Sequence, residues 1–384
     1  MATIFYSMAG EGRGHATRVK AVVEGLRGKH RIVLYAPGQA YELLEPWYRN
    51  SDVEVRSLNG LSFCYRSDGS LHYGRTLWES LRKFLGFPAQ IQMIRRQMLV
   101  EKPELVITDF DPLLPRAAEQ LGIPYLSIDH QHFLTAYNLD ILPARHRWLA
   151  LAMGIAVRCF YGSQIHTVVS SFYPAPLRKG VFQTTQVGIL IGEDIRNARP
   201  RDDGFLLAYL RRDVPSRVVR ALRKTGWKVR IYGLGSREPW ENLEFLPVER
   251  KKFVHDLSHC GALLSTAGNQ LVGEALFLGK PVLAMPERNN WEQEINGAFL
   301  EQLGGGWCIP MSSLCSKLIL DFLKRRHEFV PKIPLESLCG NIPVLQIIEK
   351  TLQKISEGRK PWGAKALGRR SWFRRPLAGL LEIP

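Results

Sequence analysis

Short apolar segments alternate along the chain with longer segments in which apolar residues recur every three or four positions. The first kind is typical of buried strands and the second of amphipathic helices. In the first half of the chain we predict strands at Thr3–Met8, Arg31–Tyr35, Leu105–Thr108, Tyr125–Ile128 and His166–Ser170, with helices near His15–Arg27 and Leu114–Leu121. Strands that alternate with helices in this way form a parallel sheet with helices on both faces.

The same pattern restarts after Gly192–Gly204, a polar segment with a proline that is typical of a linker. The strands predicted beyond it are Phe205–Leu210, Lys228–Tyr232, Ala262–Ser265 and Pro281–Met285, with helices at Ser216–Lys224 and Gln270–Phe277. The sequence therefore predicts an α/β fold with two doubly wound, Rossmann-like domains that face a central cleft. The predicted division is 1–190 for the first domain, 191–204 for the linker, 205–335 for the second domain, 336–357 for a helix packing back toward the first domain, and 358–384 for a basic, aromatic tail.

Composition narrows the class of protein. A length of 384 residues suits two domains, and a net charge of +16 favours anionic partners such as nucleotides, phospholipid surfaces or nucleic acid. The six cysteines are scattered and form no C-x-x-C pair, which argues against a zinc site and favours reduced thiols in the cytoplasm. The first residues, MATIFYSMAGEG, predict a strand instead of a signal peptide, and no apolar run has the length of a membrane span.

A glycine-rich motif, Gly10–His15 (GEGRGH), directly follows the first predicted strand. Glycine lets the backbone approach a ligand closely, and the N-terminus of the next helix offers free amides to an anion. The spacing is G-x-G-x-G-H instead of the G-x-G-x-x-G of NAD-binding proteins, and no acidic ribose partner follows about 20 residues later. A purely structural turn is the alternative interpretation.

Two residues of the first domain are candidates for acid–base chemistry. His15 opens a helix at the mouth of the sheet, where a neutral imidazole can act as a general base for a hydroxyl near pH 7. Asp109 ends a strand at the same edge and is the candidate that orients His15. The alternatives are a structural histidine, turn capping by Asp109 and Asp111, which we favour for Asp111, and a metal-binding Asp109-x-Asp111 pair.

Other segments are candidates for the acceptor side. The Asp129–His132 segment ends a strand, and we take His130 and His132, together with Arg13, as acceptor-side candidates; an ordinary polar loop is the alternative. Basic and apolar or aromatic residues are mixed in Leu81–Met98, in Arg145–Trp148 and in the tail. Such segments suit an anionic membrane surface, and helix packing with a solvated tail is the alternative.

The longest motif covers Ser265–Gly306. A strand ends at Ser265, and the small residues after it open a helix whose amides can hold a diphosphate. Glu274 lies one to two turns into that helix, where a carboxylate can accept hydrogen bonds from both ribose hydroxyls. The next strand ends at Pro286, and Trp291–Asn296 then brings acid and amide groups to a place where sugar hydroxyls can be recognised.

This segment resembles the donor-binding segment of GT-B glycosyltransferases of the MurG and UDP-glucuronosyltransferase type. Those proteins share a small-residue loop, a helix glutamate, a G-x-P-hydrophobic strand, an acidic-Gln-x-x-Asn sequence and a Gly-rich turn. The N-terminal G-x-G-R-G-H is similar to that of a bacterial and archaeal branch of the same superfamily. The resemblance covers most of residues 1–310 in the order of elements, and it implies the GT-B fold.

The resemblance also implies roles for individual residues. On the donor side, it implies that Gly268, Asn269 and Gln270 face the diphosphate and that Glu274 holds the ribose, while Phe245 and Leu246 present backbone groups to the nucleotide base. Glu292 and Gln293 are implied to touch the donor sugar, with Asn296 supporting the loop. His15 is implied to be the catalytic base, with Asp109 as its partner. Gly12, Gly14, Arg211 and Ser265 complete the expected donor-binding set, because helix N-termini and an arginine can stabilise a leaving diphosphate. Two departures from the family leave the donor sugar open: the donor loop lacks an initial histidine, and Glu292 replaces the usual aspartate.

The sequence therefore predicts a hexosyltransferase-type enzyme (EC 2.4) that moves a sugar from a nucleoside-diphosphate sugar, a UDP-sugar by the resemblance, to an acceptor hydroxyl. We expect inversion, no metal and no other cofactor, with a lipid-linked or cell-envelope glycan acceptor. The expected location is the cytoplasm, with contact to the inner face of the plasma membrane as an alternative. Two other functions stay open: a nucleotide-sugar 2-epimerase on the same fold, and a non-enzymatic nucleic-acid-binding protein, although the basic residues form no recognisable module for nucleic acid.

Overall fold

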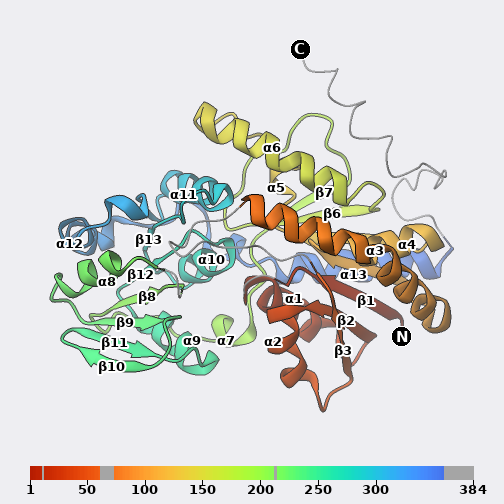
Figure 1. The fold of residues 1–384 in the computed structure, drawn as a ribbon, viewed down its shortest axis with the longest axis horizontal. Helices are drawn as coiled ribbons and strands as arrows, with labels where there is room; N and C mark the ends of the chain where they lie inside the picture. Colours follow the sequence, from red (N-terminus) through yellow and green to blue (C-terminus); the bar gives the residue numbers. More distant parts are fainter. Residues whose placement is uncertain (11–12, 61–72, 212–213, 359–384) are drawn as a thin grey trace.

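Two lobes, each built on a twisted sheet, lie side by side in the molecule (Figure 1). The computed structural model describes residues 1–10, 13–60, 73–211 and 214–358, and for residues 73–85 and Ala156 it describes the backbone. Within these ranges each sheet has seven strands, and helices cover both faces. The predicted pair of doubly wound domains is confirmed.

The first sheet has the order β3-β2-β1-β4-β5-β6-β7 and is parallel throughout. Its strands are β1 (Thr3–Met8), β2 (Arg31–Pro37), β3 (Val53–Leu58), β4 (Leu105–Asp109), β5 (Tyr125–Asp129), β6 (His166–Ser170) and β7 (Thr184–Val187). Alternate residues of the central strands fill two separate apolar layers, as expected for a sheet that is buried on both faces. Phe5 and Val33 pack on the side of α3 and α4, while Ile4 and Ile32 pack on the side of α1, α2 and α13.

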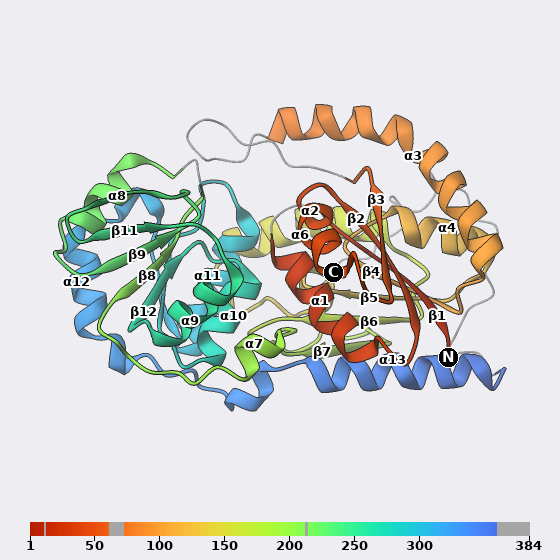
Figure 2. The same cartoon turned by 90° about the horizontal axis from the view of Figure 1, so that it is seen from below.

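The helices of this lobe lie between its strands in the chain, except for α13, which comes from the C-terminal part of the chain. They are α1 (Arg13–Leu26), α2 (Gly38–Tyr48), α3 (Tyr73–Glu101), α4 (Leu113–Leu121), α5 (Phe133–Ala136), α6 (Ala144–Phe160) and α13 (Asn341–Ser356). Val344 and Ile348 of α13 share an apolar cluster with Val19 and Val22 of α1. The helix therefore lies along the first lobe (Figure 2).

The second sheet has the order β10-β11-β9-β8-β12-β13-β14, with β10 antiparallel to β11 and the other pairs parallel. Its strands are β8 (Leu206–Tyr209), β9 (Val229–Tyr232), β10 (Arg237–Trp240), β11 (Leu243–Leu246), β12 (Ala262–Ser265), β13 (Val282–Ala284) and β14 (Gly306–Cys308). The helices are α8 (Ser216–Arg223), α9 (Arg250–His259), α10 (Asn269–Phe277), α11 (Trp291–Leu303) and α12 (Ser316–Lys324), with short 3₁₀ turns at Met311–Ser313, Arg326–Glu328 and Leu335–Leu338. The carboxyl ends of its parallel strands thus lie at one edge, where ligands bind in this class of fold.

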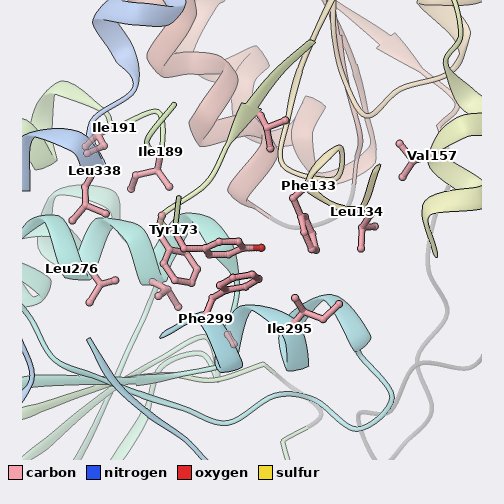
Figure 3. Close-up of a cluster of buried hydrophobic side chains, with 14 of the residues drawn as sticks. Phe133, Leu134, Val157, Tyr173, Ile189, Ile191, Leu276, Ile295, Phe299 and Leu338 are labelled. Atoms are coloured by element: carbon pink, nitrogen blue, oxygen red, sulfur yellow. The ribbon is translucent and has the colours of Figure 1, made fainter. Parts of the chain in front are cut away.

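The two lobes share one apolar core. Tyr173, which follows β6, stacks on Phe299 of α11 with ring centroids 3.8 Å apart, and Phe133 and Ile295 lie close to this pair (Figure 3). The segment between β7 and β8 contains the short helix α7 (Glu193–Arg196), so the expected linker 191–204 is not entirely irregular. We retain 191–204 as the proposed boundary. Of the helices within the described ranges, none combines the length and apolar character needed to cross a bilayer.

Candidate functional site

A histidine and an aspartate meet at the carboxyl edge of the first sheet. His15 lies in the first turn of α1, and Asp109 is the last residue of β4, which neighbours β1 in the sheet. His15 Nδ1 lies 3.0 Å from Asp109 Oδ1. Asp109 is fully buried, whereas 14% of the His15 side chain is exposed. The two residues that the sequence nominated for acid–base chemistry are therefore in direct contact.

Arg18, one turn further along α1, joins this pair. Its Nε donates to Asp109 Oδ2 at 3.0 Å and its Nη2 to Asp109 Oδ1 at 2.6 Å, and Nη2 also lies 3.0 Å from His15 Nδ1. Burial by itself raises the pKa of Asp109, but the Arg18 guanidinium and His15 outweigh burial and hold this pKa below its usual value. Asp109 is consequently ionised at neutral pH.

These contacts decide where the proton of a neutral His15 ring lies. Arg18 Nη2 can only donate, and its shorter contact is to Asp109 Oδ1; because an ionised carboxylate is a stronger acceptor than an imidazole nitrogen, we assign the tautomer in which Nδ1–H donates to Asp109 Oδ1. Nε2 then keeps its lone pair. In this state the imidazole can take a proton from a hydroxyl while Asp109 fixes the orientation of the ring.

Asp111 has a different environment, although it is only two residues away. Its Oδ2 accepts a hydrogen bond from Leu114 N at 3.0 Å in the first turn of α4, which is the capping role that we favoured. Burial raises the pKa of Asp111 to about 6. Asp109 is bound to Arg18 and Asp111 to α4, so the two carboxylates serve separate contacts instead of converging on one ion.

Replacing Asp111 with asparagine is expected to stabilise the protein by about 1–3 kcal/mol at pH 7. The folded pKa of about 6 lies above the ordinary value of 3.8 for an aspartate, so ionised Asp111 destabilises the folded state above pH 6. This penalty disappears as the pH falls from 6 to 4, and the advantage of the variant should shrink in the same interval. Urea unfolding at pH 7, 5.5 and 4.5 measures it. A constant difference across these pH values would contradict the assignment.

The end of β5 carries a second histidine–aspartate contact. His132 Nδ1 lies 2.7 Å from Asp129 Oδ2, and Asp129 Oδ1 accepts from His132 N at 2.9 Å. Burial raises the pKa of Asp129, but His132 and the Ser127 hydroxyl outweigh it and lower this pKa to about 2. His132 is therefore held beside a carboxylate at the strand end next to that of Asp109, a position compatible with its candidacy for the acceptor side.

His130 bridges the two lobes. Its Nδ1 lies 3.2 Å from Ser170 O, and its Nε2 lies 3.1 Å from Oδ1 of Asn296 on α11. Glu292 Oε1 is 3.9 Å from the same Nε2. Burial lowers the pKa of His130, which favours the neutral ring. Asn296 also donates to Ala267 O at 2.9 Å, so this contact ties the predicted donor loop to the first lobe.

The donor loop that precedes α10 has one open position. A Cβ added to Gly268 would meet no heavy atom within 4 Å, so a ligand can approach this backbone closely. Ser265, at the end of β12, is fully buried, and its Oγ donates to Thr266 O at 2.9 Å. A Cβ on Gly14 would lie 3.5 Å from Gln270 Cβ, so the first turns of α1 and α10 are in contact where the two lobes meet. The N-terminal turns of both helices thus lie close together.

The side chains at the start of α10 bind the first lobe. Asn269 Nδ2 donates to Ser170 O at 3.1 Å, and Asn269 Oδ1 accepts from Phe172 N at 3.2 Å. Gln270 Nε2 donates to Leu190 O at 2.9 Å and to Glu274 Oε1 at 3.0 Å. In this structure these amides therefore join the lobes, and of the three residues predicted to face the diphosphate, Gly268 is the one with open space beside its backbone.

Glu274 is 2% exposed and lies on the side of α10 that faces the linker. Burial raises its pKa, and Arg250 Nη1 is 3.9 Å from its carboxylate. Arg250 also binds Asp194 of α7 through two hydrogen bonds of 2.6 and 2.9 Å. Glu274 therefore occupies the predicted position on the helix, and its carboxylate lies inside a charged cluster between the lobes.

The predicted sugar-binding residues lie at the start of α11. Glu292 is partly exposed, whereas Gln293 is buried and bound to Glu287: Gln293 Oε1 accepts from Glu287 N at 2.8 Å and Gln293 Nε2 donates to Glu287 Oε2 at 3.3 Å. Arg211, at the end of β8, also pairs with the carboxylate of Glu287. Arg211, the buried carboxylate of Glu287 and the amide of Gln293 thus lie together at the carboxyl edge of the second sheet.

Comparison with known sequences identifies what kind of protein carries this arrangement. The sequence profile described as glycosyl transferase family 1 matches residues 2–326. The chain belongs to this family. It is therefore a glycosyltransferase, as the sequence predicted, which decides against a non-enzymatic nucleic-acid-binding protein.

Similar proteins agree with this assignment. An uncharacterized glycosyltransferase of Methanosarcina acetivorans is 25% identical over 389 residues, covering 91% of this chain and 98% of its own length. The calicheamicin glycosyltransferase CalG4 has a TM-score of 0.60 and 16% identity, covering 93% of this chain and 99% of its own. Arabidopsis thaliana UGT89C1, complexed with UDP-L-rhamnose, has a TM-score of 0.58 and 14% identity, covering 94% of this chain and 96% of its own. These likenesses confirm the predicted GT-B fold.

A pocket of about 400 Å³ opens in the second lobe of the glycosyltransferase. Its walls come from the start of α8, the turn after β9 and the β10–β11 hairpin, and include Leu234, Arg237, Trp240 and Phe245. Leu246, the predicted base contact, ends β11 and is 6% exposed; it belongs to the apolar layer on the opposite side of the sheet from Phe245. The pocket therefore lies beside Phe245, one of the two residues to which the resemblance gives contacts with the base, while Leu246 does not line it.

Two remaining candidates lie at the N-terminal motif. Arg13 is exposed at the first residue of α1, and Gly12 lies outside the described residues. In the part of the chain that the structure describes, no three His, Cys, Asp or Glu side chains gather as ligands for a metal ion.

Arg18, Glu287 and Arg250 were not predicted from the sequence. Arg18 follows His15 by one helical turn, so the i,i+3 spacing was a usable signal for a neighbour on the same helix face. Glu287 follows Pro286 at a strand end, the same position that drew attention to Asp109. For Arg250 no local signal existed, because its partners Asp194 and Glu274 are far away in the chain.

Proposed function

We propose that this glycosyltransferase moves a sugar from a nucleoside-diphosphate sugar, with a pyrimidine nucleotide as carrier, to an acceptor hydroxyl with inversion. The His15–Asp109 contact beside the N-terminus of α10 carries the proposal, because it pairs a proton acceptor with a diphosphate-binding backbone. The solved UGT89C1 complex contains UDP-L-rhamnose, and the similar SsfS6 was solved with thymidine diphosphate. Both ligands support a pyrimidine nucleotide here.

The proposed reaction is a single displacement. The acceptor oxygen forms a bond to the anomeric carbon while the bond from that carbon to the diphosphate oxygen breaks, which inverts the configuration. His15 Nε2 takes the hydroxyl proton, and ionised Asp109 stabilises the imidazolium that forms. The departing diphosphate gains negative charge, which the amides at the start of α10 and the Arg211 guanidinium stabilise without a metal. Glu274 is the proposed ribose ligand, and Glu292 and Gln293 are the proposed sugar ligands.

A thermal-shift series with UDP, TDP, ADP and GDP, each with and without an attached glucose, tests the donor class. At a ligand concentration of 100 times Kd, about 2.7 kcal/mol of stabilisation is expected. UDP or TDP should raise Tm more than ADP and GDP, because the similar UGT89C1 and SsfS6 were solved with UDP-L-rhamnose and thymidine diphosphate. If none of these nucleotides changes Tm, the proposed donor is wrong. Release of UDP from UDP-glucose that depends on added acceptor distinguishes transfer from 2-epimerisation.

For the acceptor we propose a lipid-linked or cell-envelope glycan, reached by a cytoplasmic protein at the inner face of the membrane. The support comes from α6, on which Trp148 is 71% and Ile155 45% exposed. The helix also carries Arg145, Arg147 and Arg158 and no acidic residue. Exposed apolar side chains beside arginines suit an interface with anionic lipid. Of the expected tail, 358–384, all but Gly358 lies outside the described residues.

Vesicle flotation with and without phosphatidylserine tests this surface. The wild-type chain should float with the anionic vesicles, and a Trp148→Ser, Ile155→Ser variant should lose about 10-fold or more of its partitioning, since about 2 kcal/mol accompanies burial of each large apolar side chain. Val330→Ser is the matched control, because Val330 is 67% exposed on the second lobe. Equal flotation of both variants would contradict the role of α6.

A further inference from the structure

Glu287 gathers side chains from separate segments around one buried carboxylate. It lies just beyond β13 at the carboxyl edge of the second sheet and is 5% exposed. Its Oε2 accepts from Asn290 Nδ2 at 3.2 Å and from Gln293 Nε2 at 3.3 Å, within the loop that opens α11. Arg211 approaches from β8, with Nε 3.3 Å from Oε1 and Nη1 3.4 Å from Oε2. Glu287 thus connects the proposed sugar-binding amide to the proposed diphosphate-binding guanidinium.

The side chains that contact Glu287 differ in how exposed they are to solvent. Gln293 is buried, and its Oε1 also accepts from Glu287 N at 2.8 Å, so Gln293 and Glu287 hold each other at two points. The Arg211 side chain is 41% exposed, and its contacts of 3.3 and 3.4 Å are longer than charge-assisted hydrogen bonds of about 2.7–2.9 Å. A half-exposed ion pair of this kind contributes little stability, so a stronger anion can displace the carboxylate from the guanidinium.

A diphosphate is an anion that could displace the Glu287 carboxylate, because of where Arg211 lies. Tyr209 on β8 pairs with Ser265 on β12, so Arg211 and Gly268 follow neighbouring strands by two and three residues. The backbone of Arg211 therefore lies beside the loop whose amides are proposed to bind the diphosphate. A diphosphate that binds those amides carries more negative charge than one carboxylate and offers the bidentate geometry that arginine prefers.

We propose that Glu287 is a positioning and specificity-determining residue that makes the site prefer the sugar-bearing donor over the bare nucleoside diphosphate. When a diphosphate binds, Arg211 moves from Glu287 to it, and the buried carboxylate loses a cationic partner. A donor sugar hydroxyl restores a hydrogen bond to Glu287 Oε1, whereas the product, which has no sugar, cannot. The product is thus bound less tightly than the donor. This inference rests on the proposed nucleotide-sugar donor.

Calorimetric titration of the full chain with UDP and with UDP-glucose, without acceptor, tests the inference; TDP and TDP-glucose serve as a parallel pair. In Glu287→Gln, UDP should bind about 2- to 5-fold tighter, the range expected for loss of a half-exposed ion pair. UDP-glucose should gain less or weaken, so the preference for donor over product falls. Glu294→Gln is the matched control, because Glu294 lies on the same helix and pairs with Arg145 at 3.3 Å; its affinities should stay unchanged.

A double-mutant cycle separates this role from a structural one. Arg211→Met should weaken UDP binding, and Glu287→Gln added to Arg211→Met should give no tightening, because the guanidinium that it releases is absent. The inference is overturned if the tightening persists in the Arg211→Met background, or if Glu287→Gln changes the affinities for UDP and UDP-glucose by the same factor. Glu287→Asp, which keeps the charge, should retain the wild-type preference and checks that the fold survives substitution. A wild-type chain that binds neither nucleotide pair overturns the proposed function itself.

Discussion

Replacing His15 with alanine is expected to lower the rate of glycosyl transfer by about 10²–10⁴-fold, the usual contribution of a general base. His15 Nδ1 contacts the ionised Asp109, and 14% of the side chain is exposed, so the ring is oriented and reachable. Binding of UDP should change by less than about 2-fold, because His15 is proposed to contact the acceptor hydroxyl and not the nucleotide. Single-turnover transfer and calorimetric titration measure the two quantities.

His15→Gln is the matched control for this prediction. It retains a polar side chain that can accept a hydrogen bond, yet an amide cannot take up a proton. Both variants should therefore be equally inactive while they keep the wild-type Tm and UDP affinity. Transfer by His15→Gln at more than a tenth of the wild-type rate would show that the imidazole serves only to hold the acceptor, and unchanged turnover in His15→Ala would remove the residue from the mechanism.

The sequence predicted the strands best where they are buried on both faces. Thr3–Met8 and Ala262–Ser265 were predicted with their observed bounds, because an apolar run between turn residues leaves little ambiguity. The edge strands β3 and β10 escaped prediction, since β3 contains Glu54 and Arg56, which form an ion pair, and β10 is exposed throughout. A run of apolar residues in the sequence indicates a buried strand. An edge strand is more exposed, so its sequence need not contain such a run.

Helices were missed for a different reason. The α2 helix contains Pro46, which usually ends a helix. The exposed apolar residues of α6, such as Trp148, obscure the amphipathic period, so the segment reads as an apolar run. The order of elements therefore sufficed for the fold, while individual helices with unusual surfaces required the structure.

For the site, sequence reasoning succeeded where one lobe decides the geometry. His15 and Asp109 meet because adjacent parallel strands end at the same edge of the sheet. It could not anticipate that Asn269 and Gln270 bind Ser170 and Leu190, because these contacts depend on how the two lobes are placed. The charged cluster around Arg250 has the same origin.

Replacing Arg18 with methionine is expected to destabilise the protein by about 3–5 kcal/mol at pH 7, the usual result of breaking a buried ion pair. The Arg18 side chain is 4% exposed and makes two hydrogen bonds to the fully buried Asp109, so the variant leaves a carboxylate in an apolar site without its cation. Transfer should also fall, because Asp109 no longer has a fixed position beside His15. Urea unfolding across pH and steady-state kinetics measure these effects.

The pH dependence distinguishes this cause from simple loss of packing. In the wild type the pKa of Asp109 is lowered, so its contribution to stability is present above the ordinary aspartate pKa of 3.8 and is lost as the pH falls through the folded pKa. In Arg18→Met only burial and His15 act strongly on Asp109, burial dominates, and the folded pKa rises above 3.8. The ionised carboxylate then costs stability at neutral pH, and protonation removes that cost, so the deficit of the variant should shrink from pH 7 to pH 4.

Asp109→Asn added to Arg18→Met should recover part of the lost stability, because the uncompensated charge is gone. A double variant that is less stable than Arg18→Met, with a deficit that does not depend on pH, would mean that Arg18 contributes through its packed aliphatic chain and not through its charge.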